Sequence, residues 1–329
     1  MNVQVTPTDH RFRHEALFYN SPESFLAGTV PFLREGVRNG EAVLVVESAA
    51  KIQALKSALG SEAAGVLFAD MAGVGANPAR IIPAWQDFVD SFSGTGRSMR
   101  GIGEPIWKER TPEELIECQR HESLLNVAFA DGEPWYLLCP YDTAALPADV
   151  IEEARRSHAL LSDGHTHAES PVFRGVEDSG APFDTPLPEP QAAFSRLEFG
   201  LRDLKVVRDM AGAHAESFGL SASRARGFVI AVNEIATNSV GHGGGRGVMR
   251  IWQEGDKLTC EVADAGRFNL PLADRMRPAA DSSGARGLWL ANQLCDLVQI
   301  RTTAEGTAVR LHLKIDPRRR LRVVPAQTN

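Results

Sequence analysis

A carboxylate, an amide and an imidazole recur at four-residue intervals at Glu234, Asn238 and His242. Residues four apart on an α-helix project from one face, so a helix here presents the three groups together. Gly243, Gly244 and Gly245 follow directly. Core packing selects Leu or Ala, and a solvated face selects Lys–Glu pairs, so neither accounts for this combination. The spacing indicates a binding or catalytic site, with plain helix-surface polarity as the alternative for Asn238 and His242.

Two other segments carry residues suited to nucleotide chemistry. Asp264 follows an apolar strand pattern, and residues 283–290 place Gly284 and Gly287 where a helix begins. A glycine-bearing loop at a helix N-terminus offers N–H groups to phosphate, and an asparagine oxygen suits Mg²⁺. A carboxylate one turn from that asparagine could accept the proton of a hydroxyl that attacks a γ-phosphate. For Asp264, a turn-forming role at the strand end is the alternative.

The elements that must position these residues form an α+β pattern. Apolar spacing predicts strands at 194–200, 248–253 and 258–263, helices at 204–218 and from 221 onward, a short helix at 287–297, and a closing hairpin of 298–303 with 307–314. Residues 264–286 are irregular. Because helices come first and hairpins last, we expect helices on one face of a mixed sheet.

The first half of the chain alternates strand and helix patterns. Apolar runs predict strands at 14–19, 42–47, 66–71, 99–102 and 135–139, and helical spacing predicts helices at 21–36, 49–59, 78–92, 112–129 and 148–160. Ser21 and Pro22 suit the N-cap and the first position of the first helix. The alternation indicates a doubly wound, mostly parallel sheet.

Composition divides the chain into domains. We assign residues 1–160 to the first domain, 161–190 to a linker rich in Pro, Gly and Ser, 191–316 to the second domain, and 317–329 to a basic tail. His165 and His167 in the linker have the spacing of a metal-binding pair, but one such pair in a polar loop is more often without function.

The bulk composition excludes several classes of protein. Of the 329 residues, 43% are apolar and 23% charged, and the net charge of −7 argues against a surface for nucleic acid or anionic lipid. No signal peptide or membrane-spanning run is visible, so we expect a cytoplasmic protein. Cys118, Cys139, Cys260 and Cys295 form no CxxC pair, which argues against structural zinc and a disulfide framework.

Residues 194–315 resemble the GHKL ATPase superfamily and, within it, the anti-sigma-factor serine kinases of bacteria. The motifs are ExxxNxxxH at 234–242, DxG at 264–266, GARGLWL at 284–290 and Gly-Thr at 306–307. The resemblance implies a GHKL sandwich that uses ATP and Mg²⁺. It implies that Glu234 acts as the base, Asn238 holds Mg²⁺, Asp264 reads adenine with support from Thr307, and residues 265–286 form the lid. Further nucleotide contacts would come from Gly266, Gly284, Arg286, Gly287 and Leu288.

Two positions depart from the family pattern. Arg267 stands where the first glycine box has its second glycine, and Ala285 stands where the second box has glycine. A Cβ at a close backbone–phosphate approach can narrow the site. Two hypotheses follow. One is a serine kinase that sequesters a sigma factor and phosphorylates a STAS-type anti-anti-sigma factor in stress-responsive transcription. The other is a non-catalytic module that only binds these partners. Resemblance also implies a homodimer.

Residues 14–160 resemble the MEDS sensory domain, which is related to RecA-type α/β folds. The resemblance rests on HEALFY at 14–19, FLREG at 32–36, Glu47, GIGEPIW at 101–107, QRHE at 119–122 and CPYD at 139–142. It implies that this half controls the second. No GxxxxGK[ST] motif occurs, so ATP hydrolysis is not expected in this half.

Polar residues of this half predict a sensory pocket for a small molecule. Glu47, Glu104 and Tyr141 fall just past predicted strand ends, where open α/β sheets bind ligands. The predicted lining is polar and aromatic: His14, Glu47, Glu104, Trp107, His121 and Tyr141. Loop anchoring for Glu104 and Trp107, and a solvated helix face for His121, are the alternatives.

Overall fold

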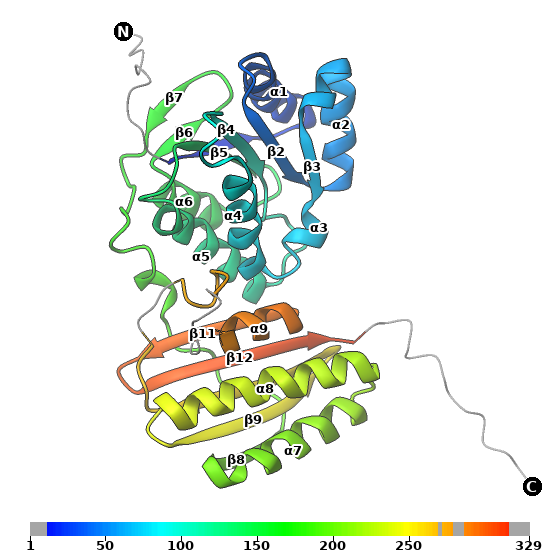
Figure 1. The fold of residues 1–329 in the computed structure, drawn as a ribbon, viewed down its shortest axis with the longest axis vertical. Helices are drawn as coiled ribbons and strands as arrows, with labels where there is room; N and C mark the ends of the chain where they lie inside the picture. Colours follow the sequence, from blue (N-terminus) through cyan, green and yellow to red (C-terminus); the bar gives the residue numbers. More distant parts are fainter. Residues whose placement is uncertain (1–11, 269–271, 279–285, 316–329) are drawn as a thin grey trace, which may run out of the picture. The chain divides into compact units, whose positions relative to one another are not determined.

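The computed structural model describes residues 12–268, 272–278 and 286–315. Its chain divides into two compact units, Met1–Pro182 and Phe183–Asn329 (Figure 1). Of the helices within those described ranges, none combines the length and apolarity that crossing a membrane needs. The proposed basic tail, 317–329, lies outside the described residues.

The first unit contains a seven-stranded sheet in the order β3-β2-β4-β5-β1-β6-β7. The strands are β1 (Arg13–Tyr19), β2 (Ala42–Glu47), β3 (Leu67–Asp70), β4 (Met99–Gly103), β5 (Trp135–Asp142), β6 (Leu160–Ser162) and β7 (His167–Glu169). Only the pairing of β6 with β7 is antiparallel among these strands. The predicted mostly parallel sheet is confirmed.

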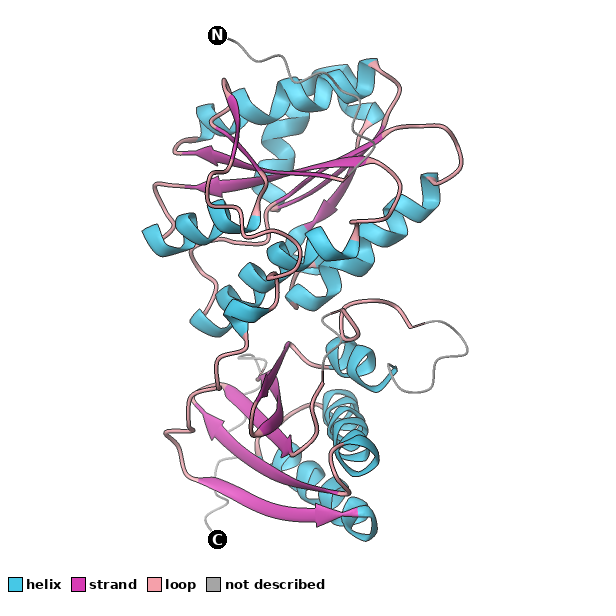
Figure 2. Ribbon diagram, turned by 90° about the vertical axis from the view of Figure 1, so that its left-hand side faces the viewer, coloured by secondary structure: helices cyan, strands magenta, loops and turns pink. Residues whose placement is uncertain are grey.

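Helices cover both faces of this sheet (Figure 2). They are α1 (Pro22–Arg38), α2 (Ala49–Leu59), the single turn α3 (Met71–Val74), α4 (Ile81–Phe92), α5 (Pro112–Ala128) and α6 (Ala148–Ser157), with 3₁₀ turns η1 (Gly60–Gly65) and η2 (Pro78–Arg80). Ser21 caps α1 and Pro22 occupies its first turn, as the sequence predicts. The cap satisfies N–H groups that the helix cannot pair internally.

The two faces of β4 show which helices lie where. Ile102 belongs to the core formed with Leu33 of α1 and Leu55 of α2. Gly101 and Gly103 point the other way, because successive residues of a strand alternate faces. A Cβ on either glycine would come within 2.7 or 2.8 Å of the Trp85 ring of α4. Helix α4 therefore packs directly on the strand backbone, opposite α1 and α2.

Two boundaries in the first unit differ from the prediction. β5 continues to Asp142, so Tyr141 lies inside the strand rather than beyond its end. Strands β6 and β7 fall largely within the predicted linker and extend the sheet beside β1. All three residues of β7 are exposed, so this edge strand lacks the apolar alternation by which strands are recognised.

The second unit contains a five-stranded sheet in the order β11-β12-β10-β9-β8. Its strands are β8 (Phe194–Gly200), β9 (Arg246–Glu254), β10 (Lys257–Asp264), β11 (Leu297–Thr303) and β12 (Gly306–Lys314). Helices α7 (Leu204–Ser217), α8 (Ala222–His242) and α9 (Arg286–Leu294) lie on one face (Figure 2). The 3₁₀ turns η3 (Ala181–Phe183) and η4 (Leu201–Asp203) complete the described elements.

The prediction of a mixed sheet is wrong, because all four strand pairs in the second unit are antiparallel. The connection between β8 and β9 explains this. It contains two successive helices, α7 and α8, so the chain reverses three times, after β8, between the helices and before β9, and β9 runs antiparallel to β8. The β9–β10 and β11–β12 connections are short hairpin turns, whereas the connection from β10 to β11 contains α9. The α+β sandwich with helices on one face is confirmed.

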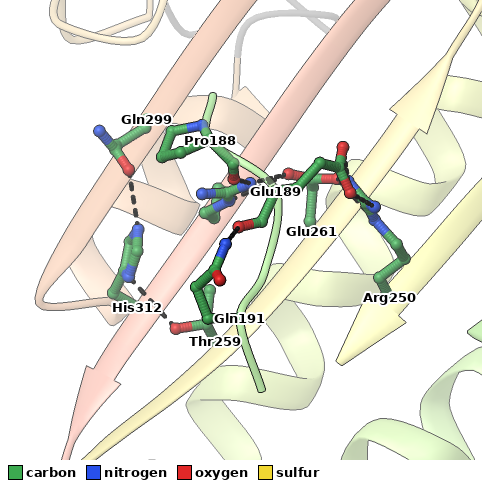
Figure 3. Close-up of polar contacts among 9 residues, drawn as sticks. Pro188, Glu189, Gln191, Arg250, Thr259, Glu261, Gln299 and His312 are labelled. Atoms are coloured by element: carbon green, nitrogen blue, oxygen red, sulfur yellow. Dashed lines mark hydrogen bonds and ion pairs between the residues drawn. The ribbon is translucent and has the colours of Figure 1, made fainter. Parts of the chain in front are cut away.

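The face of this sheet away from the helices is polar (Figure 3). Glu261 accepts hydrogen bonds from Arg250 Nε and Arg310 Nε, each over 3.0 Å. Arg310 also donates to the Pro188 carbonyl over 2.9 Å, and Glu189 pairs with Arg250. The proline-rich end of the predicted linker is therefore bound to the second sheet. Composition alone could not distinguish an anchored proline-rich segment from a free one.

Candidate functional site

Helix α8 is the platform of the candidate site in the second unit. Ser221 caps it by accepting from the Arg224 backbone N–H over 3.3 Å. Its buried face, which includes Phe228, Val232 and Ile235, belongs to the main core. The half-buried residues Glu234 and Asn238 lie outside that core, and His242 is exposed at the last turn. The helix therefore holds Glu234 and Asn238 on a rigid support.

The first turn of α9 lies against these two side chains. A Cβ placed on Gly287 would be 3.1 Å from Glu234 Oε2 and 3.2 Å from Asn238 Nδ2. Such distances are shorter than ordinary van der Waals contact, so glycine permits the close approach. Residues at the start of a helix have N–H groups without partners inside the helix. A carboxylate, an amide and an anion-attracting helix terminus thus meet in one place.

Asp264 lies at the end of β10 and organises the loop that follows. Its Oδ1 accepts from the Gly266 N–H over 2.8 Å. Thr307, its partner in the β10–β12 register, donates through Oγ1 to the Gly266 carbonyl over 2.8 Å. Thr307 Oγ1 also lies 3.2 Å from Thr302 Oγ1. Thr307 therefore supports the loop after Asp264 and does not bond to the carboxylate itself.

The C-terminus of α8 packs tightly against this loop. A Cβ on Gly243 would come within 2.3 Å of Asp264 Cγ, and a Cβ on Gly266 would come within 2.7 Å of the His242 carbonyl oxygen. The contact places Asp264 beside the last turn of the helix that carries Glu234 and Asn238. Gly243 was not among the predicted site residues, although the three consecutive glycines were a visible signal.

The other predicted nucleotide contacts differ in burial, and some of them lie outside the described residues. Gly284 and Ala285 lie outside the described residues, as does part of the predicted lid. Arg286 is exposed at the start of α9, and Leu288 is buried in the main core. Arg267 is exposed and donates to the Ala304 carbonyl over 3.3 Å. Leu288 thus serves packing, leaving only its backbone available to a ligand.

A shallow depression adjoins the candidate site. It has a volume of about 850 Å³ and is lined by residues from the β8–η4 segment, the Gly245–Val248 segment and the end of β10. Asp264 lines it, whereas Glu234 and Asn238 do not. Asp264, which packs against the C-terminus of α8, is therefore the residue that the depression shares with the predicted site. Glu234 and Asn238 lie between α8 and α9, so we place the candidate site there rather than in the depression.

A second polar group lies in the first unit, at the carboxyl ends of β1, β2 and β4. Tyr19 Oη donates to Glu104 Oε1 over 2.8 Å, and Lys51 pairs with Glu104 Oε2. Burial, followed by the nearby carboxylate of Glu104, raises the pKa of Glu47 well above its usual range and favours its neutral form. The predicted pair Glu47–Glu104 is brought together. Sequence reasoning missed Tyr19 and Lys51.

A third group surrounds Glu122 of α5. His14 Nε2 and His158 Nε2 each lie 3.2 Å from Glu122 Oε2, and Cys139 Sγ lies 3.3 Å from His14 Nε2. All four residues are buried. Burial lowers the pKa of His14 from 6.5 to about 4, and burial raises the pKa of the Cys139 thiol. Glu122 and Cys139 lie in motifs already noted in the sequence, but nothing in the sequence pointed to His158.

The remaining predicted pocket residues divide into two sets. Tyr141 is buried, with its ring 5.6 Å from that of His158, and His121 is 1% exposed on α5. The alternative of a solvated helix face for His121 is therefore wrong. Trp107 is half-buried, with the Arg110 guanidinium 3.7 Å above its ring. That stacking matches the alternative of a loop anchor.

Two family models match the chain, one in each half. Residues 13–159 match the family model described as MEDS, the MEthanogen/methylotroph, DcmR Sensory domain. Residues 197–313 match the model described as Histidine kinase-like ATPase domain. No curated protein matches. A solved structure of the RsbU and RsbW domains of a Mycobacterium tuberculosis protein is 21% identical, with a TM-score of 0.28; the match covers 36% of this chain and only 32% of that one.

Proposed function

Because the chain consists of a MEDS domain followed by a histidine kinase-like ATPase domain, we propose that it is a signalling regulator of the anti-sigma-factor kinase type. The second domain binds ATP–Mg²⁺, sequesters a sigma factor and phosphorylates a serine of a STAS-type anti-anti-sigma factor. The first domain senses a small molecule. Partners of this kind imply a cytoplasmic location and no direct contact with nucleic acid, and the chain acts as a homodimer.

The observation that carries the proposal is the approach of Gly287 to Glu234 and Asn238. The α9 N-terminus offers N–H groups and a positive dipole to phosphate. Asn238 supplies an oxygen that suits Mg²⁺, which neutralises phosphate charge. Glu234 makes no hydrogen bond to any side chain within the described ranges, so its carboxylate is available to take a proton from the attacking serine hydroxyl.

Phosphoryl transfer to a partner tests this function. The full chain is incubated with radiolabelled ATP, Mg²⁺ and a panel of STAS-type proteins that carry an accessible serine. We expect label on a serine of at least one panel member, and none when Mg²⁺ is chelated. Label that appears only on this chain, or on no protein although ATP binds, would contradict the kinase function.

A non-catalytic binding module is the second candidate, and Arg267 is the observation that favours it. This residue replaces a family glycine beside Asp264. Its side chain is directed to the Ala304 carbonyl, where it fixes the loop after β10 to the β11–β12 turn. A loop held in this way fits a domain that binds a partner protein but does not transfer phosphate to it. Capture of a sigma factor by the full chain with equal affinity in the presence and absence of ATP–Mg²⁺ supports this alternative.

Replacing Gly287 with alanine tests the geometry at α9. The added Cβ meets Glu234 and Asn238 below ordinary contact distance, so we expect ATP–Mg²⁺ affinity to fall about 10-fold, equivalent to about 1.4 kcal/mol. Isothermal calorimetry measures the change. Gly212→Ala is the matched control, because its Cβ would meet Val229 at an ordinary 3.7 Å. Equal affinities in the two variants would place the nucleotide elsewhere.

The proposed sensory pocket includes the Tyr19–Glu104–Lys51 group beside Glu47. A buried neutral carboxyl next to paired charges offers both donors and acceptors, which suits a small polar molecule. A thermal-shift screen of small alcohols, acids and amines on the full chain tests this role. We expect a stabilising compound whose effect is lost in Glu47→Leu. An effect that is identical in wild type and Glu47→Leu would place the ligand elsewhere.

A further inference from the structure

Four side chains in the first unit gather metal-binding atoms around one point. They are His14 of β1, Glu122 of α5, Cys139 of β5 and His158 after α6, and their ligand atoms all lie within 4.8 Å of one another. Separations of 3.2 to 3.3 Å join His14 Nε2 to Glu122 and Cys139, and His158 Nε2 to Glu122. A tetrahedron with metal–ligand bonds of about 2.0–2.3 Å has edges of about 3.3–3.8 Å.

Hydrogen bonds made by Nδ1 of each histidine determine which ring nitrogen carries the proton. His158 Nδ1 lies 2.8 Å from the Ala154 carbonyl, which can only accept, so Nδ1 carries the proton. Asn126 Nδ2 donates to the Ser157 carbonyl over 2.8 Å, and this leaves Asn126 Oδ1 to accept from His14 Nδ1 over 3.2 Å. Both Nε2 atoms are then free to offer a lone pair toward Glu122.

This arrangement leaves several electron-pair donors facing one another. Two Nε2 lone pairs and a carboxylate oxygen converge, and within the described ranges Glu122 Oε1 and His158 Nε2 are buried without a hydrogen-bond partner. Converging acceptors repel one another in a buried site unless a cation lies between them. Metal-ligating histidines typically donate from their other ring nitrogen to an oxygen, as the two Nδ1 atoms do here to the Ala154 carbonyl and Asn126 Oδ1.

We infer that His14, Glu122, Cys139 and His158 bind one divalent d-block ion of the zinc class. Two neutral imidazoles, one carboxylate and one thiolate together carry a charge of −2, which neutralises a divalent ion and suits a buried site. Mixed N, S and O ligands in four-coordinate geometry favour Zn²⁺ over Mg²⁺ or Ca²⁺, which prefer oxygen. The ion would join β1, β5, α5 and the segment after α6, and so stabilise the first unit.

The inferred site differs from the expectation drawn from the cysteines. The absence of a CxxC pair argued against zinc, but here a single cysteine is combined with ligands spread from residue 14 to residue 158. The adjacent pair His165 and His167 is a different matter. His165 is exposed, and His167 is bound to Glu15, so these two histidines are not part of the group.

Metal analysis of the full chain, purified without a metal-binding tag, tests the inference. We expect about one zinc per chain by elemental analysis. After chelation, Co²⁺ should bind and give a thiolate-to-cobalt charge-transfer band. Cys139→Ser should abolish that band and weaken zinc binding at least about 100-fold. Cys118→Ser is the matched control, since Cys118 is a buried cysteine of the same unit that donates to the Pro105 carbonyl. It should keep both properties.

Two further measurements keep the test decisive. If Cys139→Ser does not fold, the thermal stability of the wild-type chain tests the inference instead. Chelation should lower the midpoint of its thermal unfolding, and added zinc should restore that midpoint. The double variant His165→Ala/His167→Ala should retain full metal content. A folded, chelator-treated wild-type chain that takes up neither zinc nor cobalt would overturn the inference. Metal that persists in Cys139→Ser but is lost in the double histidine variant would overturn it as well.

Discussion

Glu234→Gln is expected to reduce phosphoryl transfer to a serine substrate by about 10³-fold, within the range that loss of a general base produces. The carboxamide has nearly the shape of the carboxylate but cannot accept the proton of the attacking hydroxyl. Because Glu234 faces the first turn of α9 from a rigid helix, the substitution should leave the architecture unchanged. ATP–Mg²⁺ affinity should stay within about threefold, so the loss appears in kcat rather than in KM.

A control carboxylate separates this effect from a general change of charge. Glu216 is exposed on α7, and Glu216→Gln should leave both the rate and the affinity unchanged. The rates are measured by label transfer under saturating ATP. If Glu234→Gln retains more than about a tenth of the wild-type rate, Glu234 is not the base.

Gly306→Ala is expected to give the largest loss of stability in the second unit. Gly306 has a φ of +138°, which L-residues rarely adopt, and a Cβ there would lie 1.9 Å from the Asp264 carbonyl oxygen. Relief of this overlap must move the backbone where β10 pairs with β12, beside Thr307. We expect a destabilisation of about 3–5 kcal/mol, measured as a lower midpoint of the corresponding calorimetric transition.

Gly255 provides the matched control for that substitution. It lies in the turn between β9 and β10 with a φ of +59°, and a Cβ on it would meet nothing within 4 Å. Gly255→Ala should therefore cost only the conformational strain of about 1–2 kcal/mol. The difference between the two variants reports the backbone contact at Asp264 together with the different φ angles of the two positions. Equal losses would show that this contact contributes nothing.

The elements that the sequence predicted well have strong local signals. β2 and α2 have the predicted bounds, because an apolar run and a Ser48 cap define their ends. The elements that were missed depend on tertiary pairing. The exposed edge strand β7 has no apolar pattern, and the antiparallel entry of β9 follows from the paired helices before it. Neither feature is encoded within a short window.

The candidate sites divide in the same way. Glu234 and Asn238 were predictable because four-residue spacing on one helix specifies a shared face. Their approach to Gly287, and the contact of Gly243 with Asp264, result from packing between elements and could not be read from spacing. The group around Glu122 is the extreme case. Its four members come from separate elements, and His158 stands in a segment without any motif.

Isothermal calorimetry of the full chain measures whether the second domain binds ATP–Mg²⁺ and whether Asn238 is required. We predict saturable binding at one site per chain that requires Mg²⁺ and weakens at least about 100-fold in Asn238→Ala. Asn233→Ala, which removes an amide of the same helix that bonds to Arg208, should bind as the wild type does. Absence of binding heat in the wild type would show that the domain does not bind ATP–Mg²⁺, and equal affinity in both asparagine variants would show that Asn238 does not hold the metal.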